Sequence, residues 1–156
     1  MGTIVTLDVL DGIVAEARAA GRSIALANGV FDLLHVGHVR YLQGAAAEAD
    51  VLIVAINDDD SVRQLKGEGR PIMPETDRAE LVAAMRGVDY VVLFGARTVT
   101  DILLRYRPDV HCKGTDYTVE TVPERPVVQS YGGRTAIVGD PKDHSTRDLL
   151  SRLAPR

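Results

Sequence analysis

Short apolar runs alternate along this chain with longer segments in which apolar residues recur every three or four positions. The runs predict β-strands, and the longer segments predict amphipathic α-helices. The clearest run, Val51-Leu-Ile-Val-Ala-Ile56, is apolar at every position, which is typical of a parallel strand that is covered on both faces. Five strands are predicted, at residues 24–27, 51–56, 90–94, 110–112 and 135–138.

Helical segments separate these strands. They are predicted at residues 6–20, 36–49, 58–65, 76–88, 98–106 and 145–153, with a further one that begins near Glu124 or Pro126. Thr76, Thr98 and Ser145 are the expected capping residues. Because each parallel neighbour requires a crossover helix, the alternation predicts an α/β fold. We expect a Rossmann-like, doubly wound parallel five-stranded sheet with helices on both faces, in a single domain over residues 1–156 that opens with a leading helix (1–22).

The segment Asn28-Gly-Val-Phe-Asp-Leu-Leu-His-Val-Gly-His38 joins the first predicted strand to the helix after it. In open α/β sheets, ligands bind outside the carboxyl ends of the strands, where such junctions lie. A helix N-terminus adds unpaired N–H groups and a partial positive charge, which favour phosphate. The junction therefore predicts an enzyme that handles nucleotides.

Composition narrows the class of protein without changing this prediction. Of the 156 residues, 46% are hydrophobic and 26% are charged, and the net charge is −4. This acidic balance argues against a nucleic-acid-binding protein, which would carry a basic patch. The single cysteine, Cys112, excludes an intrachain disulfide and is expected to be a small buried residue. No apolar run approaches the ~18 residues of a membrane span, and no signal peptide is evident, so we expect a cytoplasmic protein without a membrane partner.

Two histidines at the junction are the first candidates for chemistry. A spacing of three places His35 and His38 on the same side of the first helical turn, and Gly37 between them lets a ligand approach the backbone. Their imidazole N–H groups can donate to oxygens that gain charge in a phosphoryl- or nucleotidyl-transfer transition state. The alternative is a pair of structural histidines at a helix start. The strand, glycine and helix context favours the catalytic interpretation.

Residues 29–38 resemble the GxFDxxHxGH signature of the cytidylyltransferase-like nucleotidyltransferases. The resemblance implies that His35 and His38 are catalytic, contacting the triphosphate and stabilising the transition state at its α-phosphate. It also implies that the Phe and the Asp of the signature form the nucleotide- and metal-proximal end of the pocket. The nucleotide-binding residues expected in this segment are Gly29, Val30, Phe31, Asp32 and Gly37.

The similarity extends over nearly the whole chain to the nucleotidyltransferase domain of the bifunctional ADP-heptose synthases. It is carried by residues 49–58, 61–67, 70–72, 77–78, 88–91, 108–109 and 113–117. The resemblance implies an enzyme that adenylylates a heptose 1-phosphate. We expect a stand-alone version without the sugar-kinase domain of those proteins.

Residues after the other strands are further candidates. Lys66 can reach a phosphate as a mobile point charge, and the resemblance implies a catalytic role, although a solvated surface lysine is the alternative. Arg78 near a helix start opposes the helix dipole unless an anion is bound, and the resemblance implies that it faces the active site. Asp116 can accept hydrogen bonds from sugar or ribose hydroxyls, or merely cap a surface turn. The expected substrate-binding residues are Asn57, Arg78, Lys113, Gly114 and Asp116.

The segment Ser145-Thr-Arg-Asp148 begins the last predicted helix. Ser145 and Asp148 resemble a capping box, which gives the segment a structural role. The resemblance implies in addition that Ser145 and Thr146 bind the β- and γ-phosphates of the nucleotide. Arg147 departs from the Ser-Thr-Thr or Ser-Thr-Ser pattern of the family, and the lead-in typical of the glycerol-phosphate enzymes is missing. The departure bears on the acceptor and the nucleotide, not on the reaction class.

These residues predict a nucleotidyltransferase that joins a nucleoside triphosphate and a sugar phosphate and releases pyrophosphate. Mg²⁺ is the expected cofactor, held through the nucleotide phosphates without metal-ligating residues of the protein. The resemblance alone favours ATP over CTP, D-glycero-D-manno-heptose 1-phosphate as acceptor, and a homodimer. The alternatives are a CTP-dependent cytidylyltransferase acting on glycerol 3-phosphate or another small phosphate, a nicotinate- or pantetheine-nucleotide adenylyltransferase, and a nucleotide-binding module without turnover.

Overall fold

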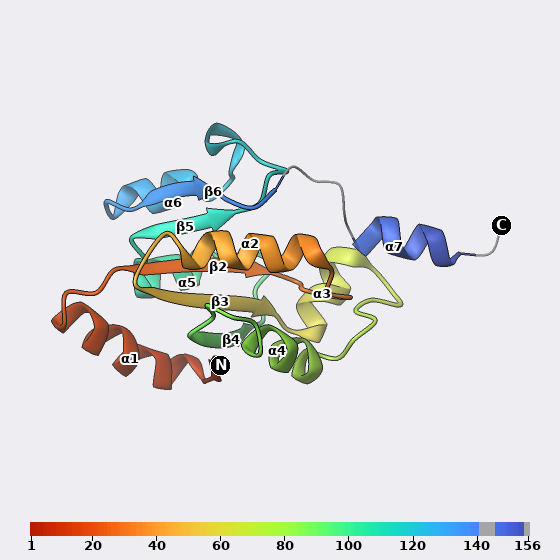
Figure 1. The fold of residues 1–156 in the computed structure, drawn as a ribbon, viewed down its shortest axis with the longest axis horizontal. Coiled ribbons are helices and arrows are strands. Elements are labelled where there is room, and N and C mark those ends of the chain that lie inside the picture. The colour runs from red at the N-terminus through yellow and green to blue at the C-terminus, as the bar shows by residue number, and fades with distance from the viewer. Residues whose placement is uncertain (141–145, 155–156) are drawn as a thin grey trace.

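The computed structural model describes residues 1–140 and 146–154, with the side chains of all of these except 146–148. In this part of the chain six parallel strands form one sheet, in the order β1-β4-β3-β2-β5-β6 (Figure 1). The strands are β1 (Thr3–Ile4), β2 (Ile24–Gly29), β3 (Val51–Asn57), β4 (Tyr90–Phe94), β5 (Val110–Lys113) and β6 (Arg134–Ile137). The predicted α/β fold is confirmed, and all five predicted strands are present.

Strand β1 corrects the predicted number of strands from five to six. It is two residues long, both residues are exposed, and it pairs with β4 at the edge of the sheet. Backbone hydrogen bonds hold the residue before the strand and the residue after it: the Gly2 N–H donates to Ala83 O, and the Val5 N–H donates to Val91 O. So short and exposed a strand needs no apolar run, and no sequence pattern marks it.

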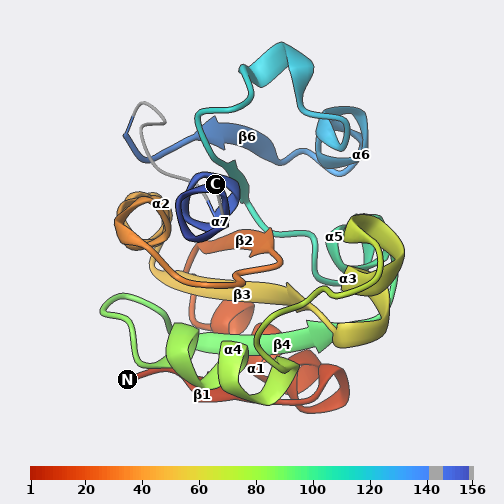
Figure 2. The same ribbon diagram turned by 90° about the vertical axis from the view of Figure 1, so that its right-hand side faces the viewer.

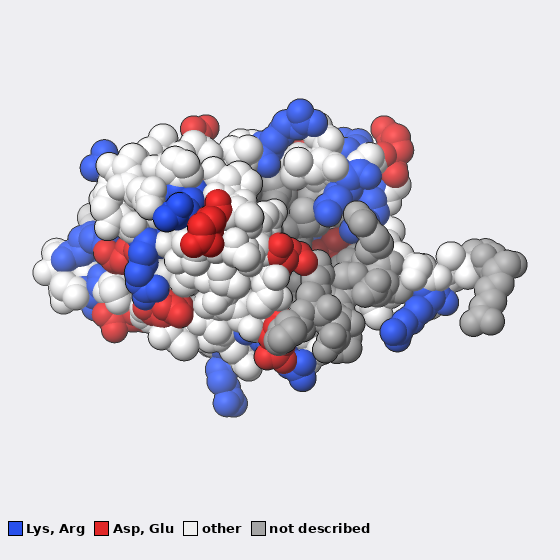
Figure 3. Space-filling model, turned by 90° about the horizontal axis from the view of Figure 1, so that it is seen from above, with Lys and Arg blue, Asp and Glu red and all other residues white. Residues whose placement is uncertain are grey.

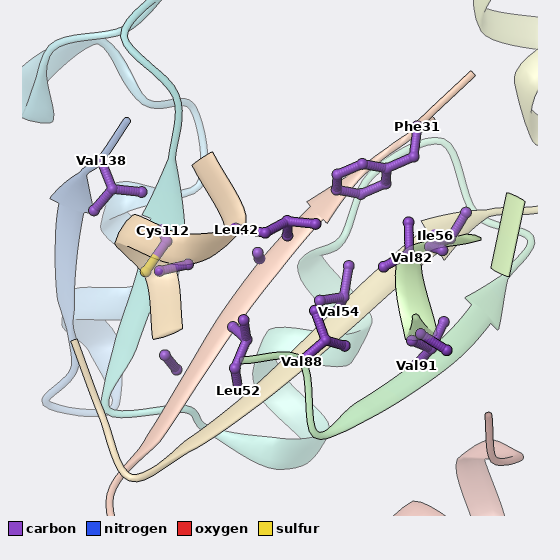
Figure 4. Packing of buried hydrophobic residues seen from close by; sticks show 14 of the residues in the cluster. Phe31, Leu42, Leu52, Val54, Ile56, Val82, Val88, Val91, Cys112 and Val138 are labelled. Carbon is purple, nitrogen blue, oxygen red and sulfur yellow. The ribbon is translucent and has the colours of Figure 1, made fainter. Parts of the chain in front are cut away.

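Helices alternate with the strands along the chain. They are α1 (Leu7–Ala19), α2 (Val36–Ala46), α3 (Asp59–Lys66), α4 (Glu75–Ala83), α5 (Thr100–Tyr106), α6 (Arg125–Ser130) and α7 (Thr146–Leu153), with a 3-10 turn η1 at Val119–Thr121. Helices α2 and α4 cover one face of the sheet, and α1, α5 and α6 cover the other (Figures 1 and 2). Their apolar side chains form two clusters, one on each face. Strand β3 contributes Val54 to the first layer and Ile53 to the second, which explains why it is apolar at every position. Figure 4 shows the first layer, with Phe31 at its end.

Two of the predicted helix caps are wrong. Helix α4 follows Pro74 and helix α5 follows Val99, and neither N-terminus has a side-chain cap, so Thr76 and Thr98 do not serve as caps. The first turn of α4 is instead held to α3, because the Asp59 N–H donates to a carboxylate oxygen of Glu75 (3.1 Å). Such tertiary bonds do not show in a local motif.

The chain changes direction across the sheet at β2. It continues from β2 to β3 and β4 on one side, and then returns to place β5 and β6 on the other side of β2. The carboxyl ends of β2 and β5 therefore flank a topological switch point, the position where open α/β sheets bind ligands. This edge of the sheet lies to the right in Figure 1, where α3 and α7 also lie.

The described surface carries charges of both signs. Basic and acidic side chains are interspersed over the face shown in Figure 3. On the described part of that face they do not form the continuous basic stripe typical of nucleic-acid-binding proteins. No helix within residues 1–140 or 146–154 is long and apolar enough to cross a membrane.

Candidate active site

The turn that follows β2 is strained and tightly packed. Phe31 and Leu33 have φ angles of 54° and 48°, in a region that bulky residues rarely occupy. The buried Phe31 ring stacks on Tyr41 with the ring centroids 6.3 Å apart, and its centroid lies 5.5 Å from that of His38. Gly29 makes room for this ring, since a Cβ there would lie 3.1 Å from its Cε2 atom. Backbone strain that buried packing maintains is typical of functional sites.

His35 and His38 cap helix α2 and fix their own tautomers. The Gly37 N–H donates to Nδ1 of His35 (3.1 Å), and the His35 N–H donates to Nδ1 of His38 (3.2 Å). A ring nitrogen that accepts an N–H bond carries no proton, so the proton of each neutral ring is on Nε2. The ring centroids are 4.1 Å apart, and both side chains are half-buried. The start of α2 therefore carries two imidazole Nε2–H donors, an arrangement suited to phosphate oxygens.

Asp32 fastens the segment before α4 to this turn. The residue is 2% exposed, and its Oδ2 accepts from the Ile72 N–H (2.8 Å) and from Nε of Arg70 (3.1 Å). Its Oδ1 accepts from the Met73 N–H (3.0 Å). Asp32 therefore holds residues 70–73 against the turn after β2, and its expected nucleotide-binding role stays a prediction.

Arg78, near the start of helix α4, is held by buried hydrogen bonds. It is 0% exposed, with Nε donating to Met73 O (3.0 Å), Nη1 to Val30 O (2.6 Å) and Asn57 O (2.8 Å), and Nη2 to Asp59 Oδ1 (2.9 Å). Three carbonyls and one carboxylate satisfy the cation, so it needs no bound anion at the helix start. The Arg78 side chain therefore ties the turn after β2, through Val30, to the end of β3, and its expected role in substrate binding stays a prediction.

Asn57 and Lys66 occupy opposite environments at the same edge of the sheet. Asn57, at the end of β3, is buried, and its Nδ2 donates to Ala96 O (3.3 Å). Lys66 is exposed at the end of α3 and forms no ion pair with the residues described. The Lys66 ammonium can therefore reach a phosphate, whereas the Asn57 amide holds the loop after β4.

The segment after β5 lies beside the start of the motif. Parallel pairing of β5 with β2 sets Lys113 next to Asn28 at the carboxyl edge. The Lys113 ammonium lies 4.9 Å from the ring centroid of Tyr117, and burial lowers the pKa of this lysine although nearby carboxylates oppose the shift. Two other predicted substrate-binding residues, Gly114 and Asp116, follow in the same segment, and Asp116 is exposed.

The two residues that are expected to bind the β- and γ-phosphates lie at the edge of the described part of the chain. Ser145 lies outside the described residues, and so does its expected role as a helix cap. Thr146 begins helix α7, but its side chain is not described. The predicted final helix itself is confirmed over Thr146–Leu153.

Sequence patterns missed Tyr41, which joins α2 to both strands at the switch point. Its hydroxyl donates to Cys112 O (2.6 Å) and accepts from the Asn28 N–H (3.4 Å), and burial raises the pKa of this phenol. The neighbouring Cys112 is buried as predicted, and burial raises the pKa of its thiol to about 12. The one sequence signal for Tyr41 is its place beside Leu42, on the inner side of a predicted helix. A tyrosine that is buried there needs a hydrogen-bond partner for its hydroxyl.

Replacing Tyr41 by phenylalanine is expected to lower the free energy of unfolding by about 1–2 kcal/mol, because it leaves the buried Cys112 carbonyl without this donor. Urea unfolding followed by circular dichroism measures the change. Tyr117→Phe is the matched control, since no hydrogen bond of its hydroxyl is present among the described residues, and it should change the free energy by less than about 0.5 kcal/mol. Equal stability of Tyr41→Phe and the unsubstituted protein would contradict the bridging role.

A parallel sheet with a histidine-capped helix at its switch point defines a class of protein, the Rossmann-like nucleotidyltransferases. The chain belongs to the cytidylyltransferase-like family, whose model matches residues 26–150. That match begins within β2 and includes both histidines of the α2 cap.

Two relatives and one solved structure show the extent of the similarity. The Bifunctional protein HldE of Geobacter sulfurreducens is 45% identical over 147 residues, which cover 94% of this chain and 30% of that protein. The HldE of Caulobacter sp. (strain K31) is 46% identical over 150 residues, which cover 96% of this chain and 31% of that protein. The chain thus spans less than a third of the length of these relatives. The crystal structure of the lipopolysaccharide core biosynthesis protein from Thermoplasma volcanium superposes with a TM-score of 0.67 and 25% identity, covering 78% of this chain and 100% of that chain.

Proposed function

We propose that this chain transfers the adenylyl group of ATP to a heptose 1-phosphate, giving ADP-heptose and pyrophosphate. The observation that carries the reaction class is the pair of Nε2–H donors at the start of α2, at the switch point of the sheet. Membership in the cytidylyltransferase-like family supports the same class. The resemblance to ADP-heptose synthases and the similarity to HldE favour ATP and a heptose phosphate.

The proposed reaction is an in-line displacement at the α-phosphate. An oxygen of the acceptor phosphate attacks the α-phosphorus, the bond from this phosphorus to the oxygen that bridges to the β-phosphate breaks, and pyrophosphate leaves with the electron pair. Negative charge grows on the phosphate oxygens, where the Nε2–H groups of His35 and His38 and the N-terminus of α2 stabilise it. Lys66 adds a positive charge from the end of α3. The proposal involves no covalent enzyme intermediate.

Mg²⁺ enters this proposal as a cofactor that the nucleotide holds. Among the described residues, no three His, Cys, Asp or Glu side chains are grouped so that they could hold a metal ion. Asp32, the acidic residue of the motif, already accepts three hydrogen bonds from residues 70–73. Mg²⁺ commonly binds substrate phosphates and water with few protein ligands, and on the triphosphate it would neutralise part of the charge.

Pyrophosphate release tests the proposed function directly. The purified chain is incubated with Mg²⁺, with ATP or CTP, and with heptose 1-phosphate or glycerol 3-phosphate, and the products are identified by mass spectrometry. We expect ADP-heptose and pyrophosphate from ATP with heptose 1-phosphate. CDP-glycerol from CTP with glycerol 3-phosphate would replace this proposal with the cytidylyltransferase alternative. ATP binding without any pyrophosphate release would indicate a binding module. Light scattering on the same preparation tests the predicted homodimer, and the cytoplasmic location remains a prediction.

A further inference from the structure

Asn28, the first residue of the segment 28–38 that joins β2 to α2, is held from both faces of the sheet. Its backbone N–H donates to the hydroxyl of Tyr41 (3.4 Å) on the side of α2. Its side-chain Oδ1 lies 2.8 Å from Nε2 of His111 on the other side. The side-chain Nδ2 makes no hydrogen bond within residues 1–140 and 146–154, and Asn28 is half-buried.

His111 is a buried imidazole that the proposed reaction does not use. It is 0% exposed on β5, and its Nδ1 has no hydrogen-bond partner in the part of the chain that the structure describes. Burial, with a smaller contribution from the Lys113 cation, lowers the pKa of His111 to about 3, so the ring is neutral at physiological pH. Because the amide oxygen of Asn28 can only accept, Nε2 of this neutral ring carries the proton and donates.

We propose that His111 is a positioning residue that turns the Asn28 amide so that its NH₂ group binds an acceptor oxygen of the nucleotide. His111 pairs in register with Leu26, two residues before Asn28, so the hydrogen bond draws Oδ1 back along β2. The amide nitrogen then faces the carboxyl edge, between β2 and β5, where open sheets bind nucleotides. Without this bond the amide can rotate and present its oxygen, which repels phosphate and ribose oxygens.

This inference rests on the proposed function only in that the site binds a nucleoside triphosphate. It is therefore tested by calorimetric titration with Mg²⁺ and α,β-methylene ATP, which needs no acceptor and undergoes no transfer. Asn28→Ala removes one neutral hydrogen bond and is expected to weaken binding about 3- to 10-fold. His111→Leu is expected to cause a similar loss. His111→Gln, whose amide NH₂ takes the place of the Nε2–H group, should bind within about twofold of the unsubstituted protein.

A double substitution separates positioning from general damage to the fold. If His111 acts through Asn28, then His111→Leu should cause no further loss of affinity in the Asn28→Ala protein. Thr135→Val is the matched control. Thr135 lies on β6, where it pairs in register with His111 of β5, and its buried hydroxyl has no partner among the described residues. This control should leave the affinity unchanged. Urea unfolding of every variant shows which ones remain folded at the temperature of the titration.

Three results would overturn the inference. The first is unchanged affinity in Asn28→Ala, a folded variant in which the amide is simply missing. The second is an equal loss from His111→Leu with and without Asn28, which would assign His111 a purely structural role. The third is a loss in His111→Gln as large as in His111→Leu. If the chain binds α,β-methylene ATP but releases no pyrophosphate with any acceptor, the proposed function fails while the titrations still decide the role of Asn28 and His111.

Discussion

Replacing His35 by asparagine is expected to lower turnover by about 10²–10³-fold while leaving the protein folded. The Nδ1 atom of His35 accepts the Gly37 N–H at the N-cap of α2, and the Oδ1 atom of asparagine can take the same position. Asparagine is among the residues that cap helices best, so the stability of the helix start should be kept. What the substitution removes is the Nε2–H group, the proposed donor to phosphate oxygens. Steady-state pyrophosphate release measures turnover, and thermal unfolding checks that the fold is intact.

His35→Gln complements this variant, because it keeps a donor at the position of Nε2 and loses the helix cap. The glutamine amide can place an N–H donor where Nε2 lies, but it no longer caps the helix. We expect its turnover to exceed that of His35→Asn, and its free energy of unfolding to fall by about 1 kcal/mol. A His35→Asn protein with nearly unchanged turnover would show that the histidine serves only as a cap, which is the structural alternative that the sequence left open.

Replacing Arg78 by methionine is expected to lower the free energy of unfolding by about 3–5 kcal/mol, a large part of the 5–15 kcal/mol that stabilises a typical domain. The substitution leaves the half-buried Asp59 carboxylate without its cation and removes donors from the carbonyls of Val30, Met73 and Asn57. Because Val30 belongs to the motif turn, turnover should fall as well. Urea unfolding measures the stability, and pyrophosphate release measures turnover.

Arg63→Met controls for the loss of an arginine as such. Arg63 pairs with Asp60 on the surface, with 49% and 79% of the two side chains exposed, so its loss should cost less than about 1 kcal/mol. Arg78→Lys keeps the positive charge, but one ammonium group cannot reach four acceptors on three separate segments, and we expect an intermediate loss. If Arg78→Met were no less stable than Arg63→Met, the buried hydrogen bonds of Arg78 would have no structural role.

Much of the fold could be predicted from the sequence because strands and helices leave periodic marks. The run at 51–56 is apolar at every position since β3 is covered on both faces, and the prediction of a parallel sheet follows from its alternation with helices. Strand β1 left no such mark, because its two residues are exposed and are held by backbone bonds alone. The caps of α4 and α5 were mispredicted for a related reason: threonines near a helix start resemble caps, but other contacts decide where the helix begins.

For the candidate site, too, some features could be predicted from the sequence and others could not. The strand-to-helix junction and its two histidines were legible in the sequence, because a short motif with fixed spacing places both rings at the start of one helix. The sequence did not show that Asp32 and Arg78 are buried supports, since both are charged and the partners of Arg78 come from segments as distant as Val30 and Met73. The neighbours of His111 and Tyr41 became known only once β5 was placed beside β2.

The sequence by itself therefore determined the layered architecture, the edge of the sheet where ligands are expected, and the residues of the turn that carries the two histidines. Those features depend on the local spacing of residues, which is already present in the unfolded chain. Only the tertiary structure decided the roles within the site: which charged groups face the ligand edge, which support it from below, and how the amide of Asn28 is oriented. These roles depend on burial and on partners far apart in the chain, and a buried charge is recognised only when the groups that satisfy it are in place.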